Sequence, residues 1–121
     1  MGKNDLLILI VDDEPEMCWA LEHILRKPGQ RVVRALSGQE ALTLAQAHRP
    51  VLAFVDAKLP DMEGLELARR LHQLAGDLRI VMVSGYFYRD DEVVQKALSE
   101  KVIADFIGKP FKNEDILKAL P

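Results

Sequence analysis

The sequence predicts an α/β fold: a doubly wound, five-stranded parallel sheet with helices on both faces. Short apolar runs recur along the chain, and between them apolar residues repeat every three or four positions, as on one face of a helix. The two patterns alternate five times with short links, which favours parallel strands joined by right-handed crossovers. A chain of 121 residues provides one such domain and leaves no room for a second.

Five apolar segments predict the strands. The run LLILIV is uninterrupted, as expected for a strand buried on both faces of a parallel sheet. The predicted strands span residues 6–11, 31–35, 51–55, 79–83 and 103–107, and the second and fifth carry the weaker patterns.

Start and stop signals delimit the helices between these strands. Pro15 suits the first turn of a first helix, and Pro28-Gly29 ends it. Ser37 can cap a second helix, which ends before Pro50. The remaining helices are predicted at 64–74, 90–99 and 113–120, the last capped by Asn113.

Composition excludes several classes of function. The formal net charge of −3 and the pI of about 5.6 argue against a nucleic-acid-binding surface, which needs clustered Lys and Arg. No apolar run approaches the roughly 20 residues of a membrane span, and the N-terminal MGKND lacks the apolar core of a secretory signal. We therefore expect a cytoplasmic location and no membrane contact. The single cysteine, Cys18, is expected to serve packing.

Polar side chains follow four of the five predicted strands. Asp12 and Asp13 close the first strand, Asp56 the third and Ser84 the fourth, and Lys109 follows the fifth. The carboxyl ends of parallel strands meet at one edge of a sheet, where ligands bind. Three carboxylates, a hydroxyl and an ammonium are therefore predicted to converge there.

This combination suits phosphoryl chemistry. The adjacent carboxylates Asp12 and Asp13 repel each other unless a cation relieves them, and Mg²⁺ takes carboxylate and phosphate oxygens as ligands. With the charge neutralised, one carboxylate can attack phosphorus while the ammonium and hydroxyl stabilise the transferring oxygens. Asp56, which stands alone at its strand end, is the best candidate nucleophile.

The motifs VDDEP, FVDAKLPDMEG, MVSG and FIGKPF, in this order, resemble those of the receiver domain of bacterial two-component response regulators. The resemblance spans the chain from Leu6 to Leu120. It implies a flavodoxin-like fold in which Asp56 accepts a phosphoryl group from a histidine kinase or a histidine phosphotransfer protein.

The same resemblance implies a metal site. Asp13 and Asp56 would ligate Mg²⁺ directly, Asp12 would act mainly through water, and the backbone carbonyl of Lys58 would complete the protein ligands. Mn²⁺ can substitute for Mg²⁺ in this interpretation.

It also implies a switch. Ser84 and Lys109 would bind the phosphoryl oxygens, and Phe106 would follow the Ser84 hydroxyl inward on phosphorylation. The peptide bond before Pro110 is usually cis in the family. Lys58 and Tyr86, two positions beyond Asp56 and Ser84, would control access of water to the phosphoryl group.

Two departures from the family pattern stand out. The segment from Ser84 to Phe106 is longer than expected, with the extra residues placed around GYFYRDD, and this leaves open whether Tyr86 covers the acceptor or turns into solvent. The last predicted helix is short. We therefore expect residues 1–121 to be one receiver domain, either a fragment that continues into an output domain beyond residue 121 or a stand-alone receiver.

The remaining features concern partners. A homodimer through the fourth helix, fifth strand and fifth helix is a further expectation. Trp19 is predicted to lie on the solvent face of the first helix, either as a single exposed aromatic or as a contact for the phosphodonor. The three histidines, His23, His48 and His72, are predicted to be surface residues away from the strand ends.

Two other functions share parts of this pattern. A phosphatase or phosphotransferase of the haloacid-dehalogenase type also uses an Asp nucleophile, Mg²⁺ and Lys, but it requires Asp-x-Asp after the first strand, whereas here the two carboxylates are adjacent. A degenerate receiver that binds partners without phosphorylation is disfavoured by the intact set of acidic, hydroxyl and ammonium side chains.

Overall fold

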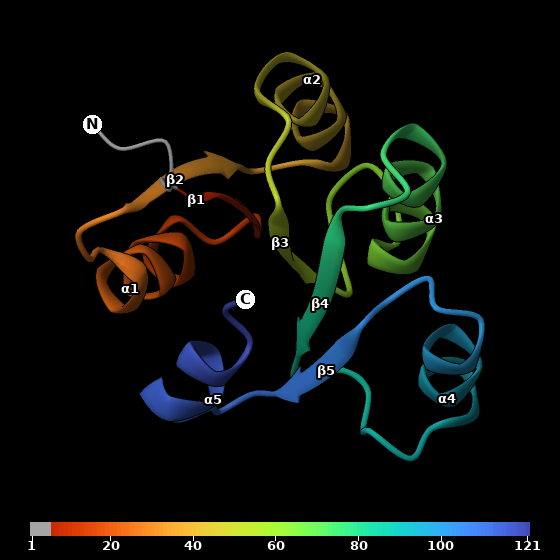
Figure 1. Cartoon of the computed structure of the whole chain (residues 1–121). Coiled ribbons are helices and arrows are strands. Elements are labelled where there is room, and N and C mark those ends of the chain that lie inside the picture. Colours follow the sequence, from red (N-terminus) through yellow and green to blue (C-terminus); the bar gives the residue numbers. More distant parts are fainter. Residues whose placement is uncertain (1–5) are drawn as a thin grey trace.

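A single parallel sheet organises the molecule. The computed structural model describes residues 6–121, so the MGKND segment, on which the expectation about a secretory signal depends, lies outside the described residues. The strands are β1 (Leu6–Val11), β2 (Gln30–Ala35), β3 (Leu52–Asp56), β4 (Arg79–Ser84) and β5 (Asp105–Gly108). All pairings are parallel, in the order β2-β1-β3-β4-β5 (Figure 1). The predicted five-stranded parallel sheet is confirmed.

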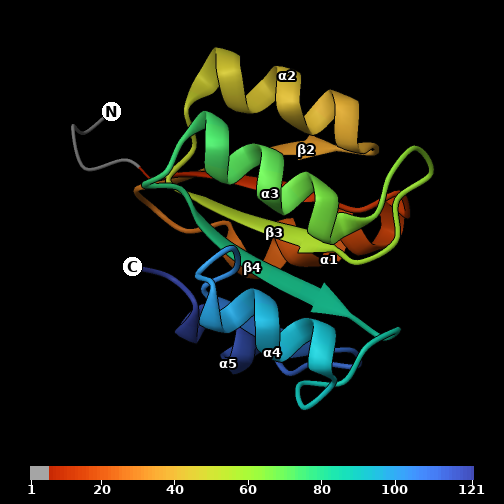
Figure 2. The same cartoon turned by 90° about the vertical axis from the view of Figure 1, so that its right-hand side faces the viewer.

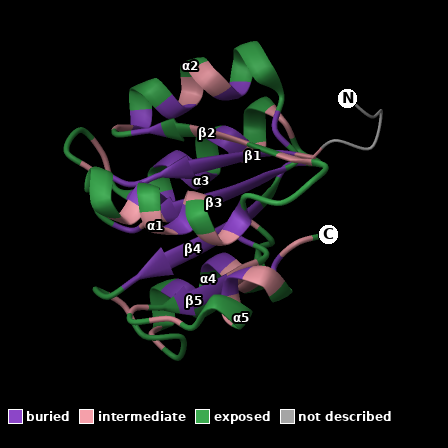
Figure 3. Cartoon of the chain, turned by 90° about the vertical axis from the view of Figure 1, so that its left-hand side faces the viewer, coloured by how far each residue is buried: buried purple, intermediate pink, exposed green. Residues whose placement is uncertain are grey.

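Helices cover both faces of this sheet. The helices α1 (Pro15–Leu25) and α5 (Asn113–Lys118) lie on one face, and α2 (Gly38–His48), α3 (Gly64–Leu74) and α4 (Glu92–Ser99) lie on the other (Figure 1). Successive strand residues point to opposite faces, so Ile8 and Ile10 pack toward α1 and α5 whereas Leu9 and Val11 pack toward the other three helices. Figure 3 shows the central strands buried and the outer helix faces exposed.

Most predicted boundaries agree with the structure within two residues. The fifth strand begins at Asp105 rather than at residue 103, because the N–H groups of Val102 and Ile103 bond to the Ala97 carbonyl (3.0 and 3.3 Å) and complete the end of α4. The predicted cap at Asn113 is wrong. Asn113 is the first helical residue of α5, and the Asp115 carboxylate instead accepts the Lys112 backbone N–H at 2.9 Å.

The topology positions the site. The strand order reverses between β1 and β3, which is where open α/β sheets bind ligands. In Figure 2 the β3–α3 and β4–α4 loops lie at the end of the sheet to which the strands point. No helix within residues 6–121 is long and apolar enough to cross a membrane.

Candidate functional site

The three predicted carboxylates lie together. Asp12, Asp13 and Asp56 each offer one oxygen, and these oxygens lie within 4.8 Å of one another. The register explains this, because Val11 pairs with Val55 and the residues that follow leave adjacent strands side by side. Asp12 is buried, Asp56 is half-buried and Asp13 is exposed, so the cluster opens to solvent on the Asp13 side.

A lysine from the far end of the chain joins this cluster. The Lys109 ammonium lies 3.1 Å from Asp12 Oδ2 and 3.6 Å from Asp56 Oδ1, and the Lys109-Pro110 peptide is cis as expected. Burial alone would lower the pKa of Lys109, but the nearby Asp12 and Asp56 carboxylates outweigh burial and raise it. Lys109 therefore stays charged, and it already relieves part of the negative charge for which the sequence suggested only a metal ion.

The carboxylate of Asp56 has one oxygen engaged. Oδ1 accepts the Ala57 backbone N–H at 2.9 Å and faces Lys109, while within residues 6–121 no hydrogen bond is donated to Oδ2. Burial raises the pKa of Asp56, and the neighbouring Asp12 charge raises it further. Oδ2 is thus the oxygen that is free for chemistry.

Buried backbone contacts hold Asp12 in place. Its Oδ1 accepts the Glu14 N–H at 2.9 Å, and the Cys18 thiol donates to its backbone carbonyl at 3.3 Å. Burial, followed by the Asp12 charge, raises the pKa of the Cys18 thiol to about 11, so the thiol remains protonated at neutral pH. Its fully buried position agrees with the packing role predicted for this cysteine.

The Ser84 hydroxyl is held by the loop that follows it. Ser84 ends β4, and its Oγ accepts backbone N–H groups from Tyr86 (2.9 Å) and Phe87 (3.3 Å). The Ser84 residue is fully buried. Any turn of this hydroxyl toward Asp56 would release two backbone donors of the β4–α4 loop.

Phe106 differs from the expectation. Its ring is already 3% exposed and belongs to the core beneath α4, so an inward turn is not open to it from this conformation. A benzyl ring without a hydroxyl gains by burial and has no polar group that favours the surface. In this conformation Phe106 already has the inward position that the resemblance implies only after phosphorylation.

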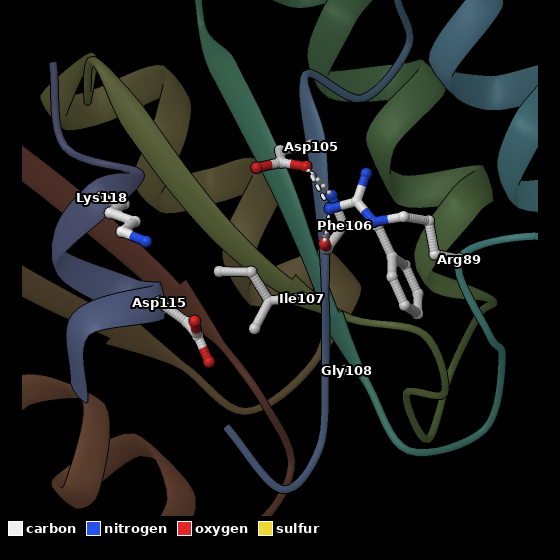
Figure 4. A pocket seen from close by; sticks show the side chains of 7 residues that line it. All are labelled: Arg89, Asp105, Phe106, Ile107, Gly108, Asp115 and Lys118. Atoms are coloured by element: carbon white, nitrogen blue, oxygen red, sulfur yellow. Dashed lines mark hydrogen bonds and ion pairs between the residues drawn. The ribbon is translucent and has the colours of Figure 1, made fainter. Parts of the chain in front are cut away.

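Arg89, which the sequence did not single out, ties the β4–α4 loop to β5. Its guanidinium donates to Asp105 Oδ1 (2.7 Å) and to the Phe106 carbonyl (2.6 Å) on the open edge of the sheet (Figure 4). These groups line a hollow of about 340 Å³ that Asp115 and Lys118 of α5 close on the other side. No local sequence signal could reveal this contact, because Arg89 and its acceptors are 16 and 17 positions apart.

Lys58 and Tyr86 lie side by side at the rim. The Lys58 ammonium bonds to both Glu63 carboxylate oxygens (2.9 and 3.2 Å) and lies 4.2 Å from the centroid of the Tyr86 ring. The pKa of Lys58 is raised, chiefly by its hydrogen bond to Glu63. Tyr86 is 61% exposed, so its ring stands beside the Lys58 side chain and does not form part of the core.

Trp19, His23 and His48 lie on the surface as predicted. Trp19 is 63% exposed on α1 and stacks on His23, with ring centroids 5.3 Å apart. His23 and His48 are exposed and His72 is half-buried, and none belongs to the carboxylate cluster.

The donor set fits a hard divalent cation. Three clustered carboxylate oxygens that are open to solvent on one side are the ligands Mg²⁺ prefers, with water and phosphate oxygens as the remainder. A nearby ammonium leaves the cluster negative, because three carboxylates outnumber one lysine.

Comparison with known proteins decides the family. Residues 8–121 match the model of the response regulator receiver domain. The chain belongs to this family. Receiver domains are the phosphoryl-accepting signalling switches of two-component systems and generally use Mg²⁺, and they are not metabolic enzymes.

Relatives of two kinds are similar to this receiver domain. It is 33% identical over 110 residues to the alkaline phosphatase synthesis transcriptional regulatory protein PhoP of Bacillus subtilis, covering 90% of this chain and 44% of PhoP. It is 29% identical over 113 residues to sporulation initiation phosphotransferase F of the same organism, covering 93% of this chain and 89% of that protein. The receiver domain thus spans less than half of one relative and most of the other.

Solved structures agree with the fold. A CheY-like response regulator receiver domain protein from Methanospirillum hungatei superposes with a TM-score of 0.85 at 32% identity, covering 94% of this chain and 89% of that structure. The flavodoxin-like fold implied by the sequence motifs is confirmed.

Proposed function

We propose that Asp56 is the phosphoacceptor of this receiver domain and that Asp12, Asp13 and the backbone carbonyl of Lys58 join it in holding Mg²⁺. The observation that carries this proposal is the cluster itself: three carboxylates within 4.8 Å, with Lys109 against two of them. The bound ion would neutralise the carboxylates and withdraw charge from the phosphoryl oxygens.

Oδ2 of Asp56 is the attacking atom in this proposal. A new P–O bond forms as the P–N bond to the donor imidazole of a histidine kinase or histidine phosphotransfer protein breaks, and the nitrogen keeps the bonding pair and takes a proton from solvent. Oδ1 stays on the Ala57 N–H, which fixes the direction of attack. Lys109 and the Ser84 hydroxyl then hold the phosphoryl oxygens. The domain in this way assists its own phosphorylation and dephosphorylation.

The switch in this proposal passes through the β4–α4 loop. When the Ser84 hydroxyl turns toward the phosphoryl group, the Tyr86 and Phe87 N–H groups lose their acceptor and the loop must rearrange. Arg89 belongs to the same loop, so its bonds to Asp105 and the Phe106 carbonyl are weakened together. Phosphorylation would change the α4, β5 and α5 surface by releasing Arg89, while the Phe106 ring stays inside.

Partners follow from this surface. We place an output domain beyond residue 121, or a separate partner, on the α4, β5 and α5 face, which is also where a homodimer is predicted. The assignment of residues 1–121 to one domain and the cytoplasmic location stay predictions.

Intact-mass measurement after incubation with acetyl phosphate and Mg²⁺ tests the proposal. We expect the protein to gain the mass of one phosphoryl group. This gain should not occur when EDTA replaces Mg²⁺, nor in Asp56→Asn. Continuous release of phosphate from many substrates would instead indicate an enzyme of the haloacid-dehalogenase type. No mass change in either protein would favour a binding module.

A further inference from the structure

The β3–α3 loop is a small hairpin that carries Lys58 on one arm. The Gly64 N–H bonds to the Ala57 carbonyl (2.7 Å) at its base, and the Leu59 N–H bonds to the Met62 carbonyl (3.2 Å) near its turn. Lys58 and Glu63 face each other across the two arms as a β-bridge. The place of the Lys58 backbone carbonyl therefore depends on how the hairpin is held.

The turn of this hairpin is bound to the first turn of α2. Asp61 Oδ1 accepts the Gly38 N–H (2.8 Å) and Oδ2 accepts the Gln39 N–H (2.9 Å), although these residues are 23 and 22 positions away. Ser37 accepts the Glu40 N–H at 3.1 Å. The helix thus has its first three free N–H groups satisfied, two of them by the hairpin.

Charge and packing reinforce the contact. A carboxylate is stabilised at the positive end of the α2 helix, and the Gly38 and Gln39 N–H groups lower the pKa of Asp61, which keeps it ionised at neutral pH. The Met62 side chain lies against Gly38, where a Cβ would stand only 2.5 Å from the Met62 sulfur. Figure 2 shows the loop beside the beginning of α2.

We infer that Asp61 is a positioning residue for the metal site, acting by fixing the hairpin that carries the backbone carbonyl of Lys58, a proposed metal ligand. This inference rests on the proposed metal site. Asp61 is exposed, lies at the turn of the hairpin and is not one of the three clustered carboxylates, so its proposed role is indirect.

The chain offers a matched control. Asp61→Ala and Ser37→Ala both remove caps from the same turn of α2, but only Asp61 links that turn to the hairpin. Both variants should lose stability. A purely structural role for Asp61 would make the two variants alike in every other measurement.

The decisive experiment is an NMR titration of the unphosphorylated protein with MgCl₂. In Asp61→Ala we expect the Mg²⁺ dissociation constant to rise about tenfold, the low end of what groups that orient metal ligands contribute. Ser37→Ala should bind as the wild type does, and Asp61→Asn, which keeps one acceptor oxygen, should be intermediate.

A second readout follows from reciprocity, because a contact that favours Mg²⁺ binding is itself strengthened by Mg²⁺. Mg²⁺ should shift the Gly38 and Gln39 amide signals in the wild type and in Ser37→Ala, but not in Asp61→Ala. Equal Mg²⁺ affinity in wild type, Ser37→Ala and Asp61→Ala would overturn the inference while leaving the proposed function intact. Failure of the wild type to bind Mg²⁺ would overturn both.

Discussion

Removing the ammonium of Lys109 should strip the carboxylate cluster of its only internal cation among the described residues. The side chains concerned are nearly buried: Asp12 is 3% exposed, Asp56 14% and Lys109 17%. Breaking a buried ion pair from one side costs about 3–5 kcal/mol. Because Asp12 keeps its bond from the Glu14 N–H, we expect Lys109→Met to lose about 3 kcal/mol of unfolding free energy in EDTA, the lower end of that range.

The assay is urea unfolding at pH 7 with EDTA or with Mg²⁺. The pKa of Lys109 is raised in the folded state, so its contribution is fully present below the unfolded pKa of 10.5 and is lost only as pH rises through the folded value. Mg²⁺ should stabilise Lys109→Met more than wild type. Binding to the folded state adds RT ln(1 + [L]/Kd) to the unfolding free energy, and the Mg²⁺ dissociation constant should be lower in the variant because Lys109 no longer competes for the carboxylates.

A matched control variant shows whether the loss of stability is specific to the buried Lys109 or follows from removing any positively charged side chain. Arg70→Met removes an exposed ion pair with Glu66 (50% and 48% exposed), which should cost less than about 1 kcal/mol. Two results would refute the proposed electrostatic role of Lys109. One is a loss of unfolding free energy in Lys109→Met no larger than in Arg70→Met, and the other is an equal stabilisation of wild type and Lys109→Met by Mg²⁺.

Three further predictions concern the same rim. Gly64→Ala should lower the unfolding free energy by about 2 kcal/mol and reduce phosphoryl labelling of Asp56, because a Cβ would stand 2.0 Å from the Asp56 carbonyl oxygen. Gly76→Ala, whose Cβ would lie 3.7 Å from its nearest neighbour, should change neither quantity, and equal losses in the two variants would refute the steric reason. Asp56→Asn should raise the melting temperature at pH 7 without metal, because the pKa of Asp56 is raised in the folded state and its ionised carboxylate therefore destabilises the fold. The gain should vanish below pH 3.8, where Asp56 is protonated in both the folded and the unfolded protein. A gain in melting temperature that does not depend on pH would contradict this reasoning. Tyr86→Ala should shorten the phosphorylated lifetime several-fold, since the ring stands against Lys58 at the rim, and equal decay after donor removal would eliminate shielding.

The sequence by itself determined the fold class and the members of the candidate site. Short apolar runs such as Leu6–Val11, which are rich in β-branched residues, favour buried strands, and their alternation with helical patterns leaves few topologies. Asp12, Asp56 and Ser84 were identifiable because each stands at or just beyond the end of a strand, and parallel strands bring those ends to one edge. These inferences need only local pattern and general sheet geometry.

Tertiary structure alone decided how these side chains are engaged. Lys109 pairs with Asp12 across 97 positions of sequence, Asp61 caps a helix 23 positions earlier, and Arg89 bonds to β5. The Phe106 ring is buried because the space under α4 receives it. No local pattern encodes such contacts, because each arises only after the crossovers have brought distant segments together, and hydrogen bonds and ion pairs depend on distances that the spacing of residues along the chain does not contain.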